Sequence, residues 1–144
     1  MIDEILHKAQ TTHALTKSEI VQLLSLNDTE KLFAAADVVR KQFVGDGVYL
    51  RALIEFSNYC KNNCLYCGIR AGNTSARRYR LTPMQIVQTA QKAAGYGYKT
   101  IVLQSGEDVW FSTEALCEII REIKKLDVAL TLSIGEKSRE EYKA

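Results

Sequence analysis

The first third of the chain carries apolar residues at the spacing of an α-helix. Residues 16–19 (Thr-Lys-Ser-Glu) have the form of a capping box, and residues 27–30 (Asn-Asp-Thr-Glu) predict a second, Asn-capped helix start. After this second start, apolar side chains recur at helical spacing, at Leu32, Ala36, Val39 and Phe43. Residues 45–47 (Gly-Asp-Gly) then predict a turn. We therefore expect residues 1–47 to form a helical N-terminal extension.

From residue 48 onward, strand and helix patterns alternate. Strands are predicted at residues 48–56, 100–104 and 128–133. Residues 82–85 (Thr-Pro-Met-Gln) open the helix after the first strand, with Thr as the cap and Pro at the first helical position. The next helix is amphipathic, with apolar side chains at Leu116, Ile119, Ile120, Ile123 and Leu126, and residues 138–141 open another. This order predicts an α/β fold with parallel strands.

The loops that follow the three strands are expected to meet at one edge of the sheet, where such folds collect their chemistry. These loops are the cysteine segment and residues 105–112 and 134–137. If the apolar strand positions face the helices, the opposite face carries polar side chains, namely Arg51, Glu55, Gln104, Thr131 and Ser133. In a barrel this face would form a polar lumen suited to a ligand. The alternative is that some of these side chains simply face water.

Composition places the chain among globular proteins of a single domain. Hydrophobic residues make up 47% of the 144 positions and charged residues 25%, with one Pro. A net charge of +2 gives no general case for a nucleic-acid or membrane-surface partner. No apolar run approaches the roughly 18 residues of a membrane span. Because Asp3 and Glu4 stand where a signal peptide would be basic, we expect a cytoplasmic protein.

Three of the four cysteines form a C-x3-C-x2-C motif at Cys60, Cys64 and Cys67. In a reducing compartment, such clusters bind metal more often than they form disulfides. A closed zinc site needs four ligands, whereas three thiolates can hold a [4Fe–4S] cluster with one iron open to a substrate or cofactor. A zinc site completed by a distant ligand is the alternative. The other candidates are expected to be structural: Cys117, His7 and His13.

This motif, placed after a first strand, resembles the signature of radical S-adenosylmethionine (SAM) enzymes. The resemblance implies a [4Fe–4S] cluster on the three cysteines, with SAM bound at the open iron and cleaved to a 5′-deoxyadenosyl radical. It also implies that Tyr66 lies near the adenine. Ser105, Gly106 and Glu107 stand where many members carry Gly-Gly-Glu, which implies that they contact the amino group of SAM. After the third strand, Glu136 is a candidate to reach SAM or the substrate.

The segment around the cysteines is basic. Between Phe56 and Gly106 there is no acidic residue, and the basic ones are Lys61, Arg70, Arg77, Arg78, Arg80, Lys92 and Lys99. A basic neighbourhood favours the more negative, reduced state of a cluster and can meet the carboxylate of SAM. A solvated face that docks an acidic electron donor accounts for the pattern equally well. A nucleic-acid groove is less favoured, because the rest of the chain cancels the charge.

Longer strings resemble the branch of the superfamily that contains biotin synthase, methylornithine synthase and the HydE family of [FeFe]-hydrogenase maturases. They are residues 56–60, 64–70, 78–82, 101–108 and 131–136, and they are most similar to the HydE family. This implies assembly of the hydrogenase H-cluster from a small iron–cysteine precursor, with a reducing electron donor and other maturation proteins as partners. Biotin synthase-like and methylornithine synthase-like activities stay open, as does a non-catalytic Fe–S or zinc-binding module.

The resemblance also bears on the length of the chain. Barrels of this family have six or more βα units, and the pattern here predicts about three. We therefore expect residues 48–144 to form the N-terminal portion of a TIM-type (βα) barrel of the radical SAM kind, and the chain to be a truncated one. Three strands alone would leave an open hydrogen-bonding edge.

Overall fold

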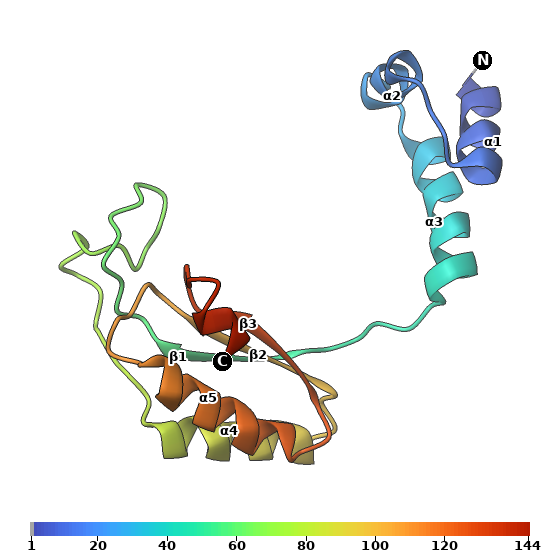
Figure 1. Ribbon diagram of the computed structural model, residues 1–144. Coiled ribbons are helices and arrows are strands. Elements are labelled where there is room, and N and C mark those ends of the chain that lie inside the picture. The colour runs from blue at the N-terminus through green and yellow to red at the C-terminus, as the bar shows by residue number, and fades with distance from the viewer. Residues whose placement is uncertain (1) are drawn as a thin grey trace. The chain divides into compact units, whose positions relative to one another are not determined.

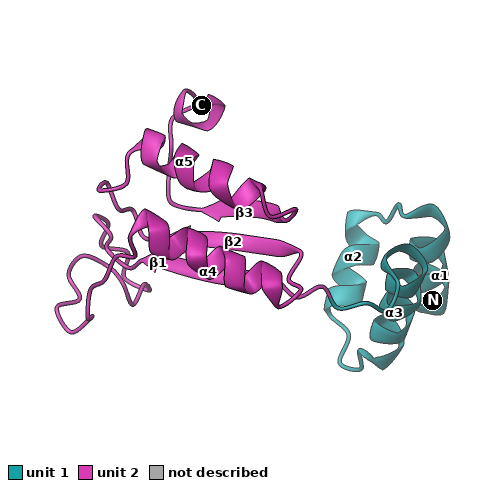
Figure 2. Cartoon of the chain, turned by 90° about the horizontal axis from the view of Figure 1, so that it is seen from below, with its two compact units in different colours: residues 1–48 teal, residues 49–144 magenta. Residues whose placement is uncertain are grey.

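The computed structural model of the chain describes residues 2–144. Contacts between residues divide the chain into two compact units, residues 1–48 and residues 49–144, which Figure 2 shows in different colours. Within residues 2–144, no helix is long and apolar enough to cross a membrane.

The first unit consists of three helices, α1 (Ile2–Thr12), α2 (Lys17–Leu24) and α3 (Glu30–Val44). The capping box expected before α2 is present, since the Thr16 hydroxyl accepts from the Glu19 N–H and the Glu19 carboxylate accepts from the Thr16 N–H. The Asn cap expected before α3 is wrong. That helix begins at Glu30, whose N–H donates to Asp28 Oδ1. Asp28 is one residue closer to the helix than Asn27, so its side chain accepts the hydrogen bond from the first amide of the helix.

The second unit is a parallel sheet covered by helices on one face. Its elements are β1 (Ala52–Ser57), α4 (Pro83–Gly95), β2 (Thr100–Ser105), α5 (Thr113–Lys124), β3 (Ala129–Ser133) and a short 3₁₀ turn, η1 (Glu141–Lys143). The strands lie in the order β1-β2-β3 and all pairs are parallel. Figures 1 and 2 both show α4 and α5 on the same side of this sheet. The predicted α/β fold with parallel strands is confirmed.

The register of the strands separates an apolar face from a polar one. Ile54 pairs with Leu103, and Ile101 with Leu130, on the face that packs against the helices. Glu55, Gln104 and Ser133 are matched in the same way on the other face, as expected. The first strand is shorter than predicted, because residues 48–51 have no strand beside them and Val48 and Leu50 are exposed. Arg51 therefore precedes the strand rather than lying in it.

The end of the chain also departs from the expectation. The helix predicted to open at residues 138–141 is limited to the 3₁₀ turn η1. Its capping signal is nevertheless used, since the Ser138 hydroxyl accepts from the Glu141 N–H and the Glu141 carboxylate accepts from the Ser138 N–H. A cap satisfies the first amides of a helix, but a longer helix needs a packed apolar face, which residues 138–144 do not bury.

Candidate functional site

The cysteine segment is a long loop, residues 58–80, whose two ends are tied together at the carboxyl end of β1 (Figure 1). At its base, the Leu81 N–H donates to the Phe56 carbonyl at 2.8 Å, and Ser57 and Arg80 form an antiparallel bridge. The side chain of Asn58 accepts from the Tyr79 N–H at 2.8 Å. The loop therefore leaves the sheet and returns to it at one place.

All three cysteines of the motif are free thiols on this loop. Cys60 and Cys67 are half-buried, whereas Cys64 is exposed on a turn closed by the Cys67 N–H to the Cys64 carbonyl, at 3.0 Å. The Glu107 N–H donates to Cys60 Sγ at 3.4 Å, the kind of bond to sulfur that tunes an iron–sulfur cluster. Cys117 lies apart, half-buried on α5.

Three reduced thiols on one loop fit an iron–sulfur cluster in number and in chemistry. They are not gathered in advance: within residues 2–144, no three His, Cys, Asp or Glu side chains lie close enough together to hold a metal ion. Binding a cluster therefore requires the three sulfur atoms of the loop to move closer together. A four-ligand zinc site has less support, because the fourth cysteine is on a packed helix.

The loop after β2 packs directly on the start of the cysteine loop. The Gly106 N–H donates to the Ser57 carbonyl at 3.1 Å, and the Lys61 N–H donates to the Glu107 carbonyl at 3.1 Å. Gly106 is buried, and a Cβ atom added there would collide with the Tyr59 carbonyl oxygen and lie 2.8 Å from Cys60 Cβ. A glycine at position 106 is thus needed because two backbones touch there.

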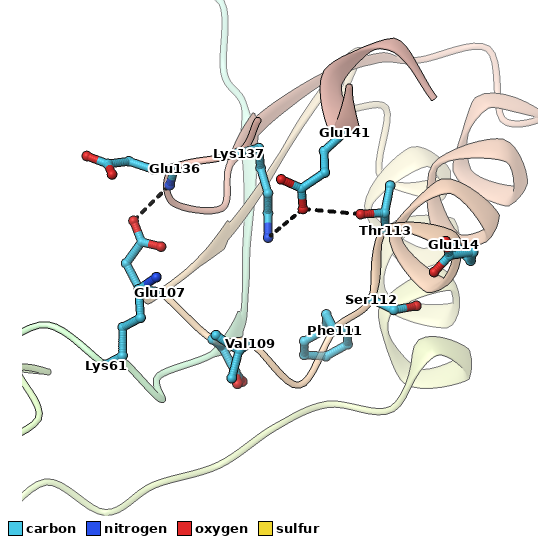
Figure 3. A pocket seen from close by; sticks show the side chains of 11 residues that line it. Lys61, Glu107, Val109, Phe111, Ser112, Thr113, Glu114, Glu136, Lys137 and Glu141 are labelled. Atoms are coloured by element: carbon cyan, nitrogen blue, oxygen red, sulfur yellow. Dashed lines mark hydrogen bonds and ion pairs between the residues drawn. The ribbon is translucent and has the colours of Figure 1, made fainter. Parts of the chain in front are cut away.

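The side chain of Glu107 binds the loop that follows β3. Its Oε1 accepts from the Glu136 N–H at 2.8 Å, an interaction drawn in Figure 3. Gly135 has a φ of 83°, and a Cβ added there would come within 2.5–2.7 Å of the Glu107 carboxylate. The Glu136 carboxylate is exposed, and Tyr66 is 93% exposed. The structure thus brings Cys60, Gly106, Glu107 and Glu136 to one edge of the sheet but leaves the Tyr66 side chain in solvent.

An ion pair that sequence reasoning missed joins the two loops. Arg80 donates from Nε to Asp108 Oδ2 at 2.6 Å and from Nη2 to Oδ1 at 2.9 Å. The guanidinium also lies 3.7 Å from the centre of the Tyr59 ring. Burial raises the pKa of Asp108, but hydrogen bonds from Arg80, from the Ser57 hydroxyl and from the Trp110 N–H outweigh it, so the pKa lies below its ordinary value. No spacing rule pairs residues 80 and 108, so the sequence carried no signal for it.

Two cavities open at this edge. One, of about 360 Å³, lies beside Cys67 on the polar face of the sheet and is also lined by Ser105, Gln104, Glu55 and Tyr79. Burial, and then the Glu55 charge, raise the pKa of Tyr79. The other, of about 430 Å³, lies between the loops after β2 and β3 and touches no cysteine (Figure 3). Only the first of these two cavities is therefore lined by a cysteine of the motif.

A parallel βα sheet that holds a three-cysteine loop at the carboxyl end of its first strand defines a partial βα barrel with an iron–sulfur type of donor set. The chain belongs to the radical SAM superfamily, whose sequence profile matches residues 54–140. The partial barrel predicted from the sequence is confirmed by solved structures of this kind. The crystal structure of methylornithine synthase (PylB) superposes with a TM-score of 0.85 at 30% identity, covering 95% of this chain and 42% of that one.

Curated relatives point to one branch of the superfamily. The chain is 49% identical over 142 residues to the [FeFe] hydrogenase maturase subunit HydE of Thermotoga maritima, covering 96% of this chain and 40% of the relative. It is 32% identical over 139 residues to 3-methylornithine synthase of Methanosarcina barkeri, covering 92% of this chain and 39% of the relative. The resemblance to HydE expected from the sequence is confirmed, and the chain spans about two-fifths of the length of these relatives.

Proposed function

We propose that this chain carries the cluster-binding part of a radical SAM enzyme of the HydE type, with Cys60, Cys64 and Cys67 as the ligands of a [4Fe–4S] cluster. The observation that carries the proposal is the loop of three free thiols tied, through the Glu107 N–H and Cys60 Sγ, to the loop after β2. When bound and reduced, such a cluster supplies the electron that cleaves SAM to methionine and a 5′-deoxyadenosyl radical.

Different residues of this chain would then bind different parts of SAM. The backbone carbonyl of Ser105 and the second carboxylate oxygen of Glu107 offer acceptors, which the ammonium group of SAM needs. The Gly106 carbonyl already accepts from the Asp108 N–H and the Ser105 hydroxyl, both at 2.8 Å, so the part of Gly106 would be to let the two loops approach closely. The cavity beside Cys67 offers about 360 Å³ next to Ser105 for part of the cofactor. Tyr66, between the second and third cysteines, would bring its ring to the adenine. The Glu136 carboxylate is left for SAM or the substrate, because only its backbone amide is bound by Glu107.

The activity we propose for the whole enzyme is assembly of the hydrogenase H-cluster from a small iron–cysteine precursor. Its partners would be a reducing electron donor in the cytoplasm and other maturation proteins. Support comes from the 49% identity to HydE, against 32% to 3-methylornithine synthase. A methylornithine synthase-type or biotin synthase-type reaction is the second candidate, because such enzymes would share the same cysteine loop and sheet edge.

Anaerobic reconstitution with iron and sulfide tests the proposal. The wild-type chain is expected to give a brown protein with about four iron atoms, the content of one [4Fe–4S] cluster. Alanine at Cys60, Cys64 or Cys67 is expected to abolish stable binding, whereas the control Cys117→Ala retains it. The electron paramagnetic resonance spectrum of the reduced protein should change when SAM is added. A colourless protein with one tightly held zinc would refute the assignment.

A further inference from the structure

One arginine side chain ties the cysteine loop together from inside. The Arg78 guanidinium donates to four backbone carbonyls: from Nη1 to Asn58 at 2.6 Å and Ile69 at 2.7 Å, and from Nη2 to Arg70 at 2.7 Å and Asn73 at 3.3 Å. Asn58 precedes the first cysteine, and the other three follow the third. The two arms of the loop are therefore joined through one half-buried cation.

The acceptors explain why this side chain has to be an arginine. Backbone carbonyls carry partial negative charge, and a guanidinium can donate to several of them in one plane. Lysine offers a single nitrogen and cannot span both arms with the same geometry. No carboxylate is among these four acceptors, so the Arg78 guanidinium binds the backbone of the loop rather than an acidic side chain.

Other bonds of the loop complement this tie without duplicating it. The Ala71 N–H donates to the Asn62 carbonyl at 2.8 Å, and the Gly72 N–H donates to Asn63 Oδ1 at 3.0 Å. These bonds connect the two arms farther from the sheet. Ordering a long loop costs conformational entropy for each residue, so a free loop would have to meet this cost at the moment it takes up its ligand.

We infer that Arg78 is a positioning residue that joins the two arms of the cysteine loop before any cluster binds, so that assembly starts from a loop whose arms are already ordered. This rests on the proposed function, in which the loop is the cluster site. Arg78 acts through the backbone carbonyls it binds, and none of its four hydrogen bonds goes to a sulfur atom.

Arg77 offers a matched control. It is exposed and lies next to Arg78 on the same segment, so Arg77→Gln makes the same change of charge and side-chain type. Arg70 is a less suitable control, because its guanidinium donates to the Cys67 carbonyl at 3.3 Å.

Hydrogen exchange on the metal-free, reduced, full 144-residue chain tests the inference without a cluster. In Arg78→Gln the amides of Ala71 and Gly72 are expected to exchange roughly tenfold faster or more, because the loss of even one charge-assisted hydrogen bond is worth about that factor. The amides of β2 should be unchanged, and Arg77→Gln should stay within about twofold of wild type. Equal exchange in Arg78→Gln and Arg77→Gln would overturn the inference.

Lysine at the same position separates the effect of the planar, forked guanidinium group from the effect of its positive charge. Arg78→Lys should recover less than about half of the lost protection, since it keeps the charge and loses the fork. Full recovery would overturn the positioning role assigned to the fork. If Arg78→Gln does not fold, Arg78→Lys is compared with Arg77→Lys by the same criterion.

Cluster assembly supplies the second readout. The initial rate of anaerobic reconstitution should fall in Arg78→Gln and stay near wild type in Arg77→Gln. A wild-type chain that assembles no cluster would refute the proposed function, and the exchange measurement would still decide whether Arg78 orders the loop. A cluster that assembles equally fast in wild type and in Arg78→Gln would overturn the inference alone.

Discussion

The two units of the chain are held together in different ways. In residues 49–144, strands and helices share one continuous core in which Ile86, Ile101, Leu103 and Ile123 are fully buried. In residues 2–48, only Ile5, Leu6 and Leu23 are buried, and α3 buries none of its side chains. Most of the ion pairs, such as Lys8–Glu19 and Arg40–Asp46, lie in the helical unit.

The difference shows which unit can hold functional side chains in fixed positions. In this unit the core between the sheet and its helices holds the strands in register, and this fixes the carboxyl ends of the strands and the loops that start there. Exposed ion pairs stabilise much less for each contact, because water competes for both charges. The cysteine loop is attached to the unit with the larger buried core.

The largest effect is expected from removing a core side chain of the sheet. Leu103→Ala should lower the free energy of unfolding by about 2–5 kcal/mol, the usual cost of a cavity at a fully buried leucine. The same substitution at Leu24, which is 79% exposed, should change it by no more than about 0.5 kcal/mol. Urea unfolding followed by the fluorescence of Trp110, the only tryptophan, measures the first, and far-ultraviolet circular dichroism measures the second. Similar losses in both variants would contradict the contrast.

A smaller effect is expected from the ion pairs. The Asp108 side chain is 2% exposed and accepts both bonds of Arg80, so Asp108→Asn should cost about 1–3 kcal/mol of unfolding free energy. Asp46 accepts from Arg40 in the helical unit but is 73% exposed, and Asp46→Asn should cost at most about 1 kcal/mol. Urea unfolding measures both. If Asp108→Asn cost no more than Asp46→Asn, the pair would not fasten the two loops.

Removing a helix cap is expected to lower the free energy of unfolding by about the same amount in both units, but a different measurement detects the loss in each. Thr82 and Thr16 each cap a helix through a complete capping box, and alanine at either position should cost about 1 kcal/mol. In Thr82→Ala the loss should lower the urea midpoint of the Trp110 transition. In Thr16→Ala it should reduce the helical signal of residues 2–48 with that midpoint unchanged. A shift of the Trp110 midpoint in Thr16→Ala would show that the units unfold together.

The smallest effect is an acid dependence within the helical unit. The hydrogen bond from Lys8, and then the bonds from the N–H and hydroxyl of Thr16, lower the pKa of Glu19 to about 2 from 4.5. A carboxyl whose pKa is lower in the folded state stabilises that state fully above its unfolded pKa. The contribution of Glu19 should therefore be complete above pH 4.5 and disappear as the pH falls to about 2.

Acid titration of the helical signal in circular dichroism tests this dependence. Glu19→Gln should flatten the loss of signal over that pH range, because the glutamine cannot be protonated. Glu30→Gln in α3 makes the same change of charge in the same unit and is the control. Identical curves for wild type and Glu19→Gln would rule out the assigned role.

Much of the fold followed from short-range patterns. The caps at Thr16 and Thr82 were predicted because a capping box involves residues three apart, and the two faces of the strands because side chains alternate. The start of β1 was predicted too early, since alternation continues through residues 48–51 where no second strand exists to pair with them. The η1 turn was predicted as a helix for a related reason, because a cap cannot supply the packing that a helix needs.

The order of the amino acids alone was enough to mark the cysteine loop, because a C-x3-C-x2-C motif places three thiols within eight residues. It could not reveal how the loop is held. Asp108 meets Arg80 across 28 positions, Glu107 meets Glu136 across 29, and the Glu107 N–H meets Cys60 across 47. These contacts depend on how three parallel strands place their carboxyl ends side by side, and no local spacing encodes that arrangement.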